Sequence, residues 1–109
     1  YLIKTGGENV YPAEVEAVIS RHPAIQEACV FGVPDPRWGE TIKAVLVLQA
    51  GQSATREEIV AWCRDRLASY KRPRYLQFVR SEELPRSTTG KLQRHELARF
   101  VLDDGQRVD

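Results

Sequence analysis

The chain has 109 residues, which is enough for one domain with its own core and too few for a two-domain enzyme of ordinary size. Lysine and arginine number 16 against 15 aspartates and glutamates, so the net charge of +1 gives no reason to expect a nucleic acid or an anionic membrane as partner. No apolar run reaches the roughly 20 residues of a membrane-spanning helix, and no cleavable signal sequence opens the chain. We therefore expect a soluble, cytoplasmic protein without a transmembrane segment.

Two further observations concern the cysteines and the first residue. Cys29 and Cys63 lie in apolar stretches without CxxC spacing, which favours buried thiols over a disulfide, and we expect no metal site. The chain begins at Tyr1 in mid-pattern, without an initiator methionine, so we expect a piece of a longer protein.

The first predicted elements are a loop and a helix. Residues 5–9 predict a loop, in which the pair Gly6-Gly7 permits backbone conformations that a Cβ would forbid. A helix is expected from about Pro12 to Arg21, because proline suits the first turn and the apolar residues after it recur at i, i+3 and i+4 (Val15, Val18 and Ile19).

Two strands are predicted next. Residues 25–33 are rich in small and β-branched side chains, and residues 41–48 are nearly continuous in apolar ones. Residues 34–39 between them read Pro-Asp-Pro-Arg-Trp-Gly and predict a loop or tight turn, since two prolines lack the N–H that a strand ladder needs.

A second helix is predicted to begin at Thr55, which forms a capping box with Glu58, and Pro73 ends whatever continues past Tyr70. Residues 75–79 predict a third strand, and a last amphipathic helix through Leu97 is expected to end near Asp103, with a frayed tail at 103–109. These elements predict a small single domain of the α/β (α+β) class, with a sheet of about three strands flanked by helices.

The stretch Leu84–Arg94, LPRSTTGKLQR, looks at first like a phosphate-binding P-loop. That loop needs a glycine, four residues, then Gly-Lys and a hydroxyl residue. Here Pro85 stands at the first glycine and Leu92 at the hydroxyl position. Proline has no N–H to donate and leucine has no oxygen for a cation, so we reject a P-loop. What remains is a hydroxyl-rich turn that presents Lys91 before the last helix, with the role of the lysine left open.

Four ordered motifs give the chain a wider context. They are Gly-Gly-Glu-Asn-Val-Tyr-Pro-Ala-Glu-Val-Glu at 6–16, Gly-Val-Pro-Asp-Pro-Arg-Trp-Gly-Glu at 32–40, Tyr-Lys-Arg-Pro at 70–73 and Pro-Arg-Ser-Thr-Thr-Gly-Lys at 85–91. Together they resemble the C-terminal lid domain of acyl-CoA synthetases, members of the adenylate-forming (AMP-dependent synthetase/ligase) superfamily. The resemblance covers residues 1–102, and the hinge residue of the family falls just before Tyr1.

The resemblance implies an enzyme that joins a carboxylic acid, fatty or other, to ATP to give acyl-AMP, and then transfers the acyl group to CoA. In this family the small domain takes a different pose on the N-terminal domain for each half-reaction. The implied substrates of the full-length enzyme are ATP and CoA, with Mg²⁺ bound with ATP outside this domain. The implied partners are the N-terminal domain of the same polypeptide, acyl-AMP and CoA, and no nucleic acid.

By resemblance Lys91 is the catalytic residue of the first half-reaction. A fixed cation between the carboxylate and the α-phosphate oxygens stabilises the charge that develops as the two anions meet. Its neighbours in the turn would let the loop insert and be held (Ser87, Thr88, Thr89 and Gly90). The alternative is a solvated surface lysine at a helix start.

The resemblance also places Gly6, Gly7 and Glu8 at the active site in the thioester-forming pose. The glycine pair would line the pantetheine tunnel, because a narrow thiol-bearing arm passes close to a backbone only where no side chain projects. Glu8 would help to organise this tunnel. The alternative for Glu8 is a carboxylate that favours the positive end of the helix beginning at Pro12.

Four more residues match positions where some relatives bind the CoA nucleotide: Trp38, Tyr70, Arg72 and Arg74. Aromatic rings can stack on an adenine base, and arginines can hold phosphates with two hydrogen bonds. The alternatives are a loop anchor for Trp38 and plain surface charge for the two arginines.

Two other functions stay open: the lid of a carrier-protein-loading adenylation domain, as in peptide synthetases, and a freestanding module that binds CoA or a protein. In the implied family, the acid pocket and the main ATP site belong to the N-terminal domain. We therefore expect the isolated 109 residues to fold and to catalyse nothing.

Overall fold

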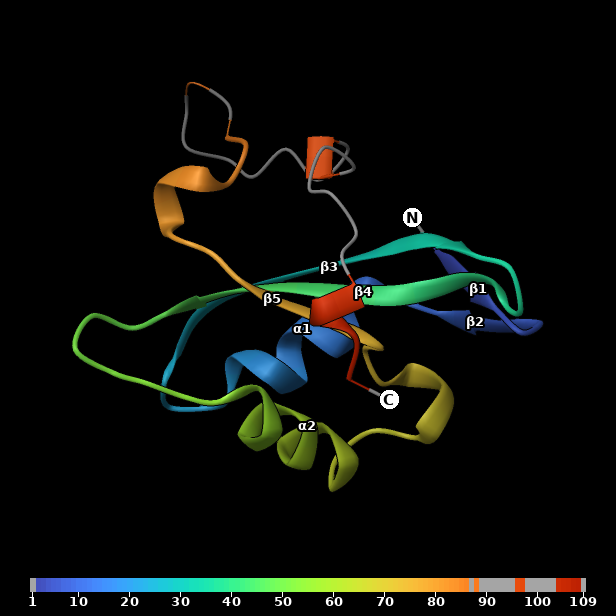
Figure 1. The fold of residues 1–109 in the computed structure, drawn as a ribbon, viewed down its shortest axis with the longest axis horizontal. Helices are drawn as coiled ribbons and strands as arrows, with labels where there is room; N and C mark the ends of the chain where they lie inside the picture. The colour runs from blue at the N-terminus through green and yellow to red at the C-terminus, as the bar shows by residue number, and fades with distance from the viewer. Residues whose placement is uncertain (1, 87, 89–95, 98–103, 109) are drawn as a thin grey trace.

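The computed structural model describes residues 2–86, 88, 96–97 and 104–108 (Figure 1). In chain order the strands and helices are β1 (Ile3–Thr5), β2 (Glu8–Val10), α1 (Pro12–Ser20), β3 (Ile25–Asp35), β4 (Gly39–Leu48), α2 (Arg56–Arg64) and β5 (Tyr75–Phe78). The described residues also form short 3-10 turns at η1 (Ser69–Lys71), η2 (Ser81–Glu83) and η4 (Asp104–Gln106). The α+β class predicted from the sequence is confirmed.

A five-stranded sheet organises the domain, and β4 is its central strand. On one side β4 pairs antiparallel with β3 along almost its whole length. On the other side it pairs antiparallel with the end of β1 and parallel with β5, and β2 continues the sheet beyond β1. The sequence predicted about three strands and a loop at residues 5–9. That number was too low, because β1 and β2 have three residues each, too few to show a strand pattern.

Both faces of the sheet are buried. Figure 1 shows α1 and α2 together below the sheet, while η2 lies on the opposite side. Along β4 the side chains of Ile42, Ala44 and Leu46 join the core between the sheet and the two helices. Val45 and Val47 join a second cluster on the other face, with Leu84 and Leu97 from the C-terminal part of the chain. The continuous apolar run of this strand follows from burial on both sides.

The helices follow the sequence prediction at their starts. Pro12 opens α1, as expected from its missing N–H, and the helix ends within one residue of the predicted position. At α2 the Thr55 hydroxyl accepts a hydrogen bond from the N–H of Glu58 at 3.1 Å, which caps the first turn. The indole N–H of Trp62 in α2 donates to the carbonyl of Val18 in α1 at 2.8 Å, so the two helices are tied together.

The end of α2 differs from the prediction. The helix stops at Arg64, well before Tyr70, and the chain then forms η1. Arg72 donates from Nε to the carbonyl of Leu67 at 2.9 Å and from Nη2 to that of Arg64 at 3.2 Å. The last carbonyls of a helix lack partners within it, and the Arg72 guanidinium donates to one of them, that of Arg64.

The predicted loop at residues 34–39 proves to be a shorter turn. Pro34 and Asp35 belong to β3 and pair with Glu40 and Gly39 of β4, so only Pro36–Trp38 lie outside the ladder. Proline is tolerated because β3 is an edge strand of the sheet. The N–H of Val30 points away from β4 to the Glu16 carboxylate at 2.8 Å, and position 34, four residues on, faces the same way.

The described part of the C-terminal tail is docked, whereas the sequence suggested that it would fray. Arg107 bridges to Tyr75 of β5, and the N–H of Val108 donates to the carbonyl of Arg74 at 2.9 Å. The Arg107 guanidinium donates to the Tyr75 hydroxyl at 3.1 Å, and Arg56 of α2 donates to the carbonyl of Gly105. The predicted last helix lies largely outside the described residues.

Candidate functional site

Two tight turns meet at one end of the sheet, because Thr5 at the end of β1 pairs with Gly39 at the start of β4. The first is the β1–β2 hairpin, in which Gly6 and Gly7 are the two residues between the paired Thr5 and Glu8. Their φ angles are +56° and +84°, and such two-residue turns favour glycine because other residues are strained at positive φ. The N–H of Gly6 donates to the carbonyl of Trp38 in the second turn at 2.9 Å.

The indole of Trp38 covers Gly6. A Cβ at position 6 would lie 2.9 Å from Trp38 Cε3, closer than a real methyl group approaches a carbon atom. A Cβ at Gly7 would meet nothing within 4 Å. Gly6 therefore has both a conformational and a packing reason to be glycine, while Gly7 leaves open space in front of the backbone.

Trp38 is half-buried and is flanked by two guanidinium groups. Arg37 lies 4.5 Å from the ring centroid and Arg74, at the residue before β5, lies 5.3 Å from it. These are cation–π distances, and they place two positive charges beside one aromatic ring. The main chain of Arg74 is fixed as well, since its N–H donates to the carbonyl of Ile42 at 2.9 Å. Arg37 was not among the sequence candidates, and its position next to Trp38 was the signal that could have found it.

The other three sequence candidates lie elsewhere. Arg72 is bound to the end of α2, and Tyr70 is 39% exposed in η1. Beside Tyr70, Lys71 forms an ion pair with Glu14 of α1 at 2.9 Å, and this hydrogen bond raises the pKa of Lys71. Glu8 is exposed in β2. The structure thus brings together Gly6, Trp38 and Arg74, and Arg72 shares with Arg74 the lining of a neighbouring cavity.

A cavity of about 150 Å³ lies between α2 and the start of β5. Three arginines line it, Arg64, Arg72 and Arg74, together with the buried thiol of Cys63. Burial raises the pKa of Cys63 to about 11, against the opposing effect of the nearby arginines. The thiol is therefore protonated at neutral pH and is a poor nucleophile.

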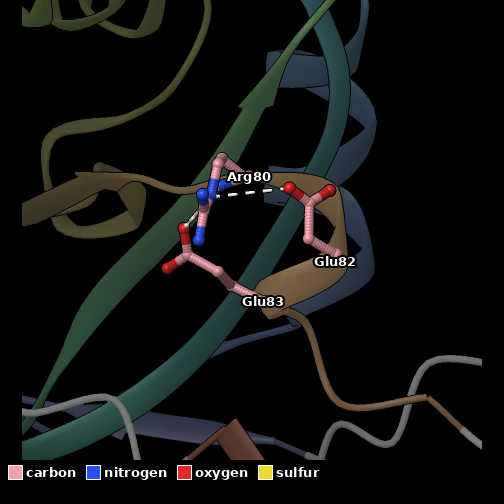
Figure 2. Close-up of polar contacts among 3 residues, drawn as sticks. All are labelled: Arg80, Glu82 and Glu83. Atoms are coloured by element: carbon pink, nitrogen blue, oxygen red, sulfur yellow. Dashed lines mark hydrogen bonds and ion pairs between the residues drawn. The ribbon is translucent and has the colours of Figure 1, made fainter.

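Polar contacts within residues 80–83 order the η2 turn that follows β5. Figure 2 shows Arg80, after β5, between the carboxylates of Glu82 and Glu83. The Glu83 carboxylate accepts from the backbone N–H of Arg80 at 3.2 Å and from its side chain at 3.0 Å. The backbone bond, and then the side-chain bond, lower the pKa of Glu83.

A second ion pair joins Arg86 to β3. Arg86 donates from Nη2 to the Glu27 carboxylate of β3 at 2.5 Å and from Nη1 at 3.3 Å, and the pKa of Arg86 is raised by this bond. Thr88 is exposed. The predicted catalytic residue Lys91 lies outside the described residues, as do Ser87, Thr89 and Gly90.

The described residues contain neither a metal-binding cluster nor a membrane-spanning helix. In that part of the chain no three His, Cys, Asp or Glu side chains gather closely enough to hold a metal ion. Of the helices placed there, none has the length and apolarity that a membrane crossing needs.

The fold and these turns define a small α+β domain with basic and aromatic groups at one end of its sheet. The chain belongs to the family of the AMP-binding enzyme C-terminal domain, whose model matches residues 14–91. The match ends at Lys91, so the lysine turn lies within the family pattern. The resemblance inferred from the four motifs is confirmed.

Acid–CoA ligases are among the known proteins that this chain resembles. The chain is 50% identical over 96 residues to the mitochondrial medium-chain acyl-CoA ligase ACSF2 of Danio rerio, covering 88% of this chain and 16% of that protein. It is 51% identical over 96 residues to the 2-succinylbenzoate–CoA ligase of Bacillus velezensis, covering 88% and 19%. Among solved structures, o-succinylbenzoate CoA synthetase (MenE) from Bacillus subtilis, in complex with the acyl-adenylate intermediate OSB-AMP, matches with a TM-score of 0.79 and 44% identity over 88% of this chain and 19% of that one. The chain thus spans less than a fifth of the length of each of these proteins.

Proposed function

We propose that this chain is the mobile C-terminal domain of an ATP-dependent, AMP-forming acid–CoA ligase. The carboxylate of the acid attacks the α-phosphorus of ATP, which releases pyrophosphate and leaves acyl-AMP. The thiol of CoA then attacks the acyl carbon and AMP leaves. The family match over residues 14–91, which includes the lysine turn, is the observation that carries the proposal.

In the first half-reaction Lys91 supplies a positive charge at the carboxylate and phosphate oxygens that come together. The charge is worth more in the transition state than before it, because the two anions approach only then. Replacing Lys91 by alanine removes one such donor and slows pyrophosphate release by at least about 100-fold. The Arg86–Glu27 pair supports this role, because it ties Arg86, which precedes Lys91 in the same motif, to β3.

In the second half-reaction the β1–β2 turn and Trp38 face CoA. The open space at Gly7 suits the narrow pantetheine arm, and the ring of Trp38 suits the flat adenine base. Arg74 beside that ring, with Arg37, offers cations for the CoA phosphates. Glu8 lies next to the same turn. Tyr70 and Arg72 precede Arg74 in the chain, and in this proposal they contact the CoA nucleotide from its outer side. Mg²⁺ would accompany ATP and bind outside this domain.

The acid itself is chosen elsewhere in the enzyme. The two curated relatives take acids of different kinds by name, a medium-chain acyl group and 2-succinylbenzoate, although each shares about half of the residues of this domain. Because relatives named for different acids share this domain, we place the acid pocket outside it. We propose a fatty or other carboxylic acid as substrate, and CoA as acceptor in preference to a carrier protein, because both relatives are CoA ligases.

The test uses the full-length protein that contains this chain. The purified protein is incubated with ATP, Mg²⁺, CoA and a panel of medium-chain and aromatic acids, and acyl-CoA and AMP are measured by chromatography. We expect acyl-CoA and AMP in equal amounts with at least one acid, and neither product from the isolated 109 residues. In a parallel reaction, a pantetheinylated carrier protein takes the place of CoA as the acyl acceptor. Acylation of the carrier alone would contradict the proposal, and so would acyl-CoA formation by the isolated chain.

A further inference from the structure

Asp35 occupies a position that nothing in the proposed chemistry uses. It is the last residue of β3, it is only 9% exposed, and one carboxylate oxygen accepts two backbone hydrogen bonds. The donors are the N–H groups of Arg37 and Trp38, both at 2.8 Å. The turn that Asp35 closes leads into Gly39, whose φ is +83°. Aspartate at the first position, proline at the second and glycine at the end are the residue types that such hairpin turns favour.

Trp38, whose N–H donates to Asp35, contacts Gly6, Arg37 and Arg74. The Trp38 carbonyl accepts the N–H of Gly6, and its indole covers the Cα of that glycine. The same ring lies beside the guanidinium groups of Arg37 and Arg74. Trp38 thus connects the β1–β2 turn to the start of β5, and its own backbone is fixed by Asp35.

We propose that Asp35 is a positioning residue for the CoA half-reaction. Its carboxylate fixes the Pro36–Trp38 turn, so that Trp38 can close the β1–β2 turn and present its ring to the CoA nucleotide at the same time. This role rests on the proposed function, in which Trp38 faces CoA. Asp35 itself touches no substrate and acts through Trp38.

The two acceptor bonds make a matched pair of variants available. Asp35→Ala leaves both N–H groups without their acceptor, so the turn is free to rearrange and the ring loses its fixed place. Asp35→Asn keeps an oxygen at the same position, which can accept both bonds, and removes only the charge. Function that depends on the turn is therefore lost in the alanine variant and restored in the asparagine variant.

The kinetic test measures both half-reactions of the full-length enzyme: pyrophosphate release from ATP plus acid, and thioester formation from premade acyl-AMP plus CoA. We expect Asp35→Ala to raise the KM for CoA about tenfold, the loss that two weakened hydrogen bonds allow, with pyrophosphate release unchanged. Asp35→Asn returns the KM to near the unmutated value. An unchanged KM in Asp35→Ala refutes the proposal. An equal loss in both half-reactions that asparagine does not rescue also refutes it, since the turn would then serve folding alone.

A spectroscopic test follows the ring directly. The 109-residue chain carries two tryptophans, so Trp62→Phe leaves Trp38 as the only one. In that background we expect Asp35→Ala to shift the Trp38 emission to longer wavelength, as the ring becomes more exposed, and Asp35→Asn to leave it in place. Identical spectra for all three proteins would contradict the positioning role.

One further variant separates this proposal from the function on which it rests. Trp38→Ala removes the ring itself. If Trp38→Ala leaves the KM for CoA unchanged, the CoA contact fails and the positioning role fails with it. If Trp38→Ala raises this KM and Asp35→Ala does not, the CoA contact stands and only the role of Asp35 is refuted.

Discussion

Replacement of Gly6 by alanine tests the contact that closes the candidate site. Alanine at φ +56° costs about 1–2 kcal/mol of stability, because an L-residue is strained in this region. Its methyl group would also lie 2.9 Å from Trp38 Cε3, and displacing a ring from a tight contact costs roughly 1–3 kcal/mol more. The predicted total is about 2–5 kcal/mol. Gly7→Ala is the matched control: it has φ +84° and open space, so only the strain of about 1–2 kcal/mol applies.

The assay is urea unfolding of the 109-residue chain, followed by circular dichroism, for both alanine variants with and without Trp38→Ala. We expect Gly6→Ala to be the more destabilising variant when Trp38 is present. When Trp38 is removed, the two variants should cost the same within about 0.5 kcal/mol. Equal losses of stability in Gly6→Ala and Gly7→Ala when Trp38 is present would refute the packing argument, because backbone strain alone predicts equal losses at the two positions.

Three other predictions concern stability and the lysine turn. The folded pKa of Cys63 lies near 11, above the ordinary 9.0, so its contribution to stability is complete well below pH 9 and falls by about 2 kcal/mol as the pH rises to 11. Urea unfolding at pH 8 and pH 11 measures the fall in the free energy of unfolding between the two values, and this fall should be smaller in Cys63→Ala than in the unmutated chain. An equal fall in both proteins would contradict the role of the Cys63 thiol. Thr55→Ala should cost about 1 kcal/mol by removing the α2 cap, while Thr55→Ser should cost little; equal stability of the two would be evidence against the cap. Arg86→Met should slow pyrophosphate release by the full-length enzyme several-fold and leave thioester formation from premade acyl-AMP unchanged, and Glu27→Gln should do the same more weakly; an effect on the second step alone would contradict the anchoring role.

Local patterns predicted much of the fold. The Pro12 helix start, the Thr55 cap and the apolar run of β4 are each encoded within a few neighbouring residues, and the structure has them where the sequence suggested. The sequence did not reveal β1 and β2, because three residues carry no periodicity. The pairing of β1 with β4 depends on tertiary contacts, and β2 joins the sheet only through β1. The end of α2 was not predicted for a similar reason. Arg72, which lies beyond the helix, donates to the carbonyl of its last residue, Arg64.

The candidate site was predicted in part. The motifs gave Gly6, Trp38 and Arg74, but their meeting depends on strand register across more than thirty residues, which no local pattern shows. The Arg86–Glu27 pair joins residues 59 positions apart and has the same origin. Asp35 is a different case. Its place before proline in a turn was visible in the sequence, and only the structure adds what its oxygen holds.

The central claim is that one small domain serves two half-reactions through two different turns. The most direct measurement compares Lys91→Ala and Trp38→Ala in the full-length enzyme, each in pyrophosphate release and in thioester formation from premade acyl-AMP. The account predicts a crossover. Lys91→Ala loses about 100-fold or more in the first assay and little in the second, and Trp38→Ala raises the KM for CoA in the second and changes little in the first. Parallel losses of both variants in both assays would contradict it.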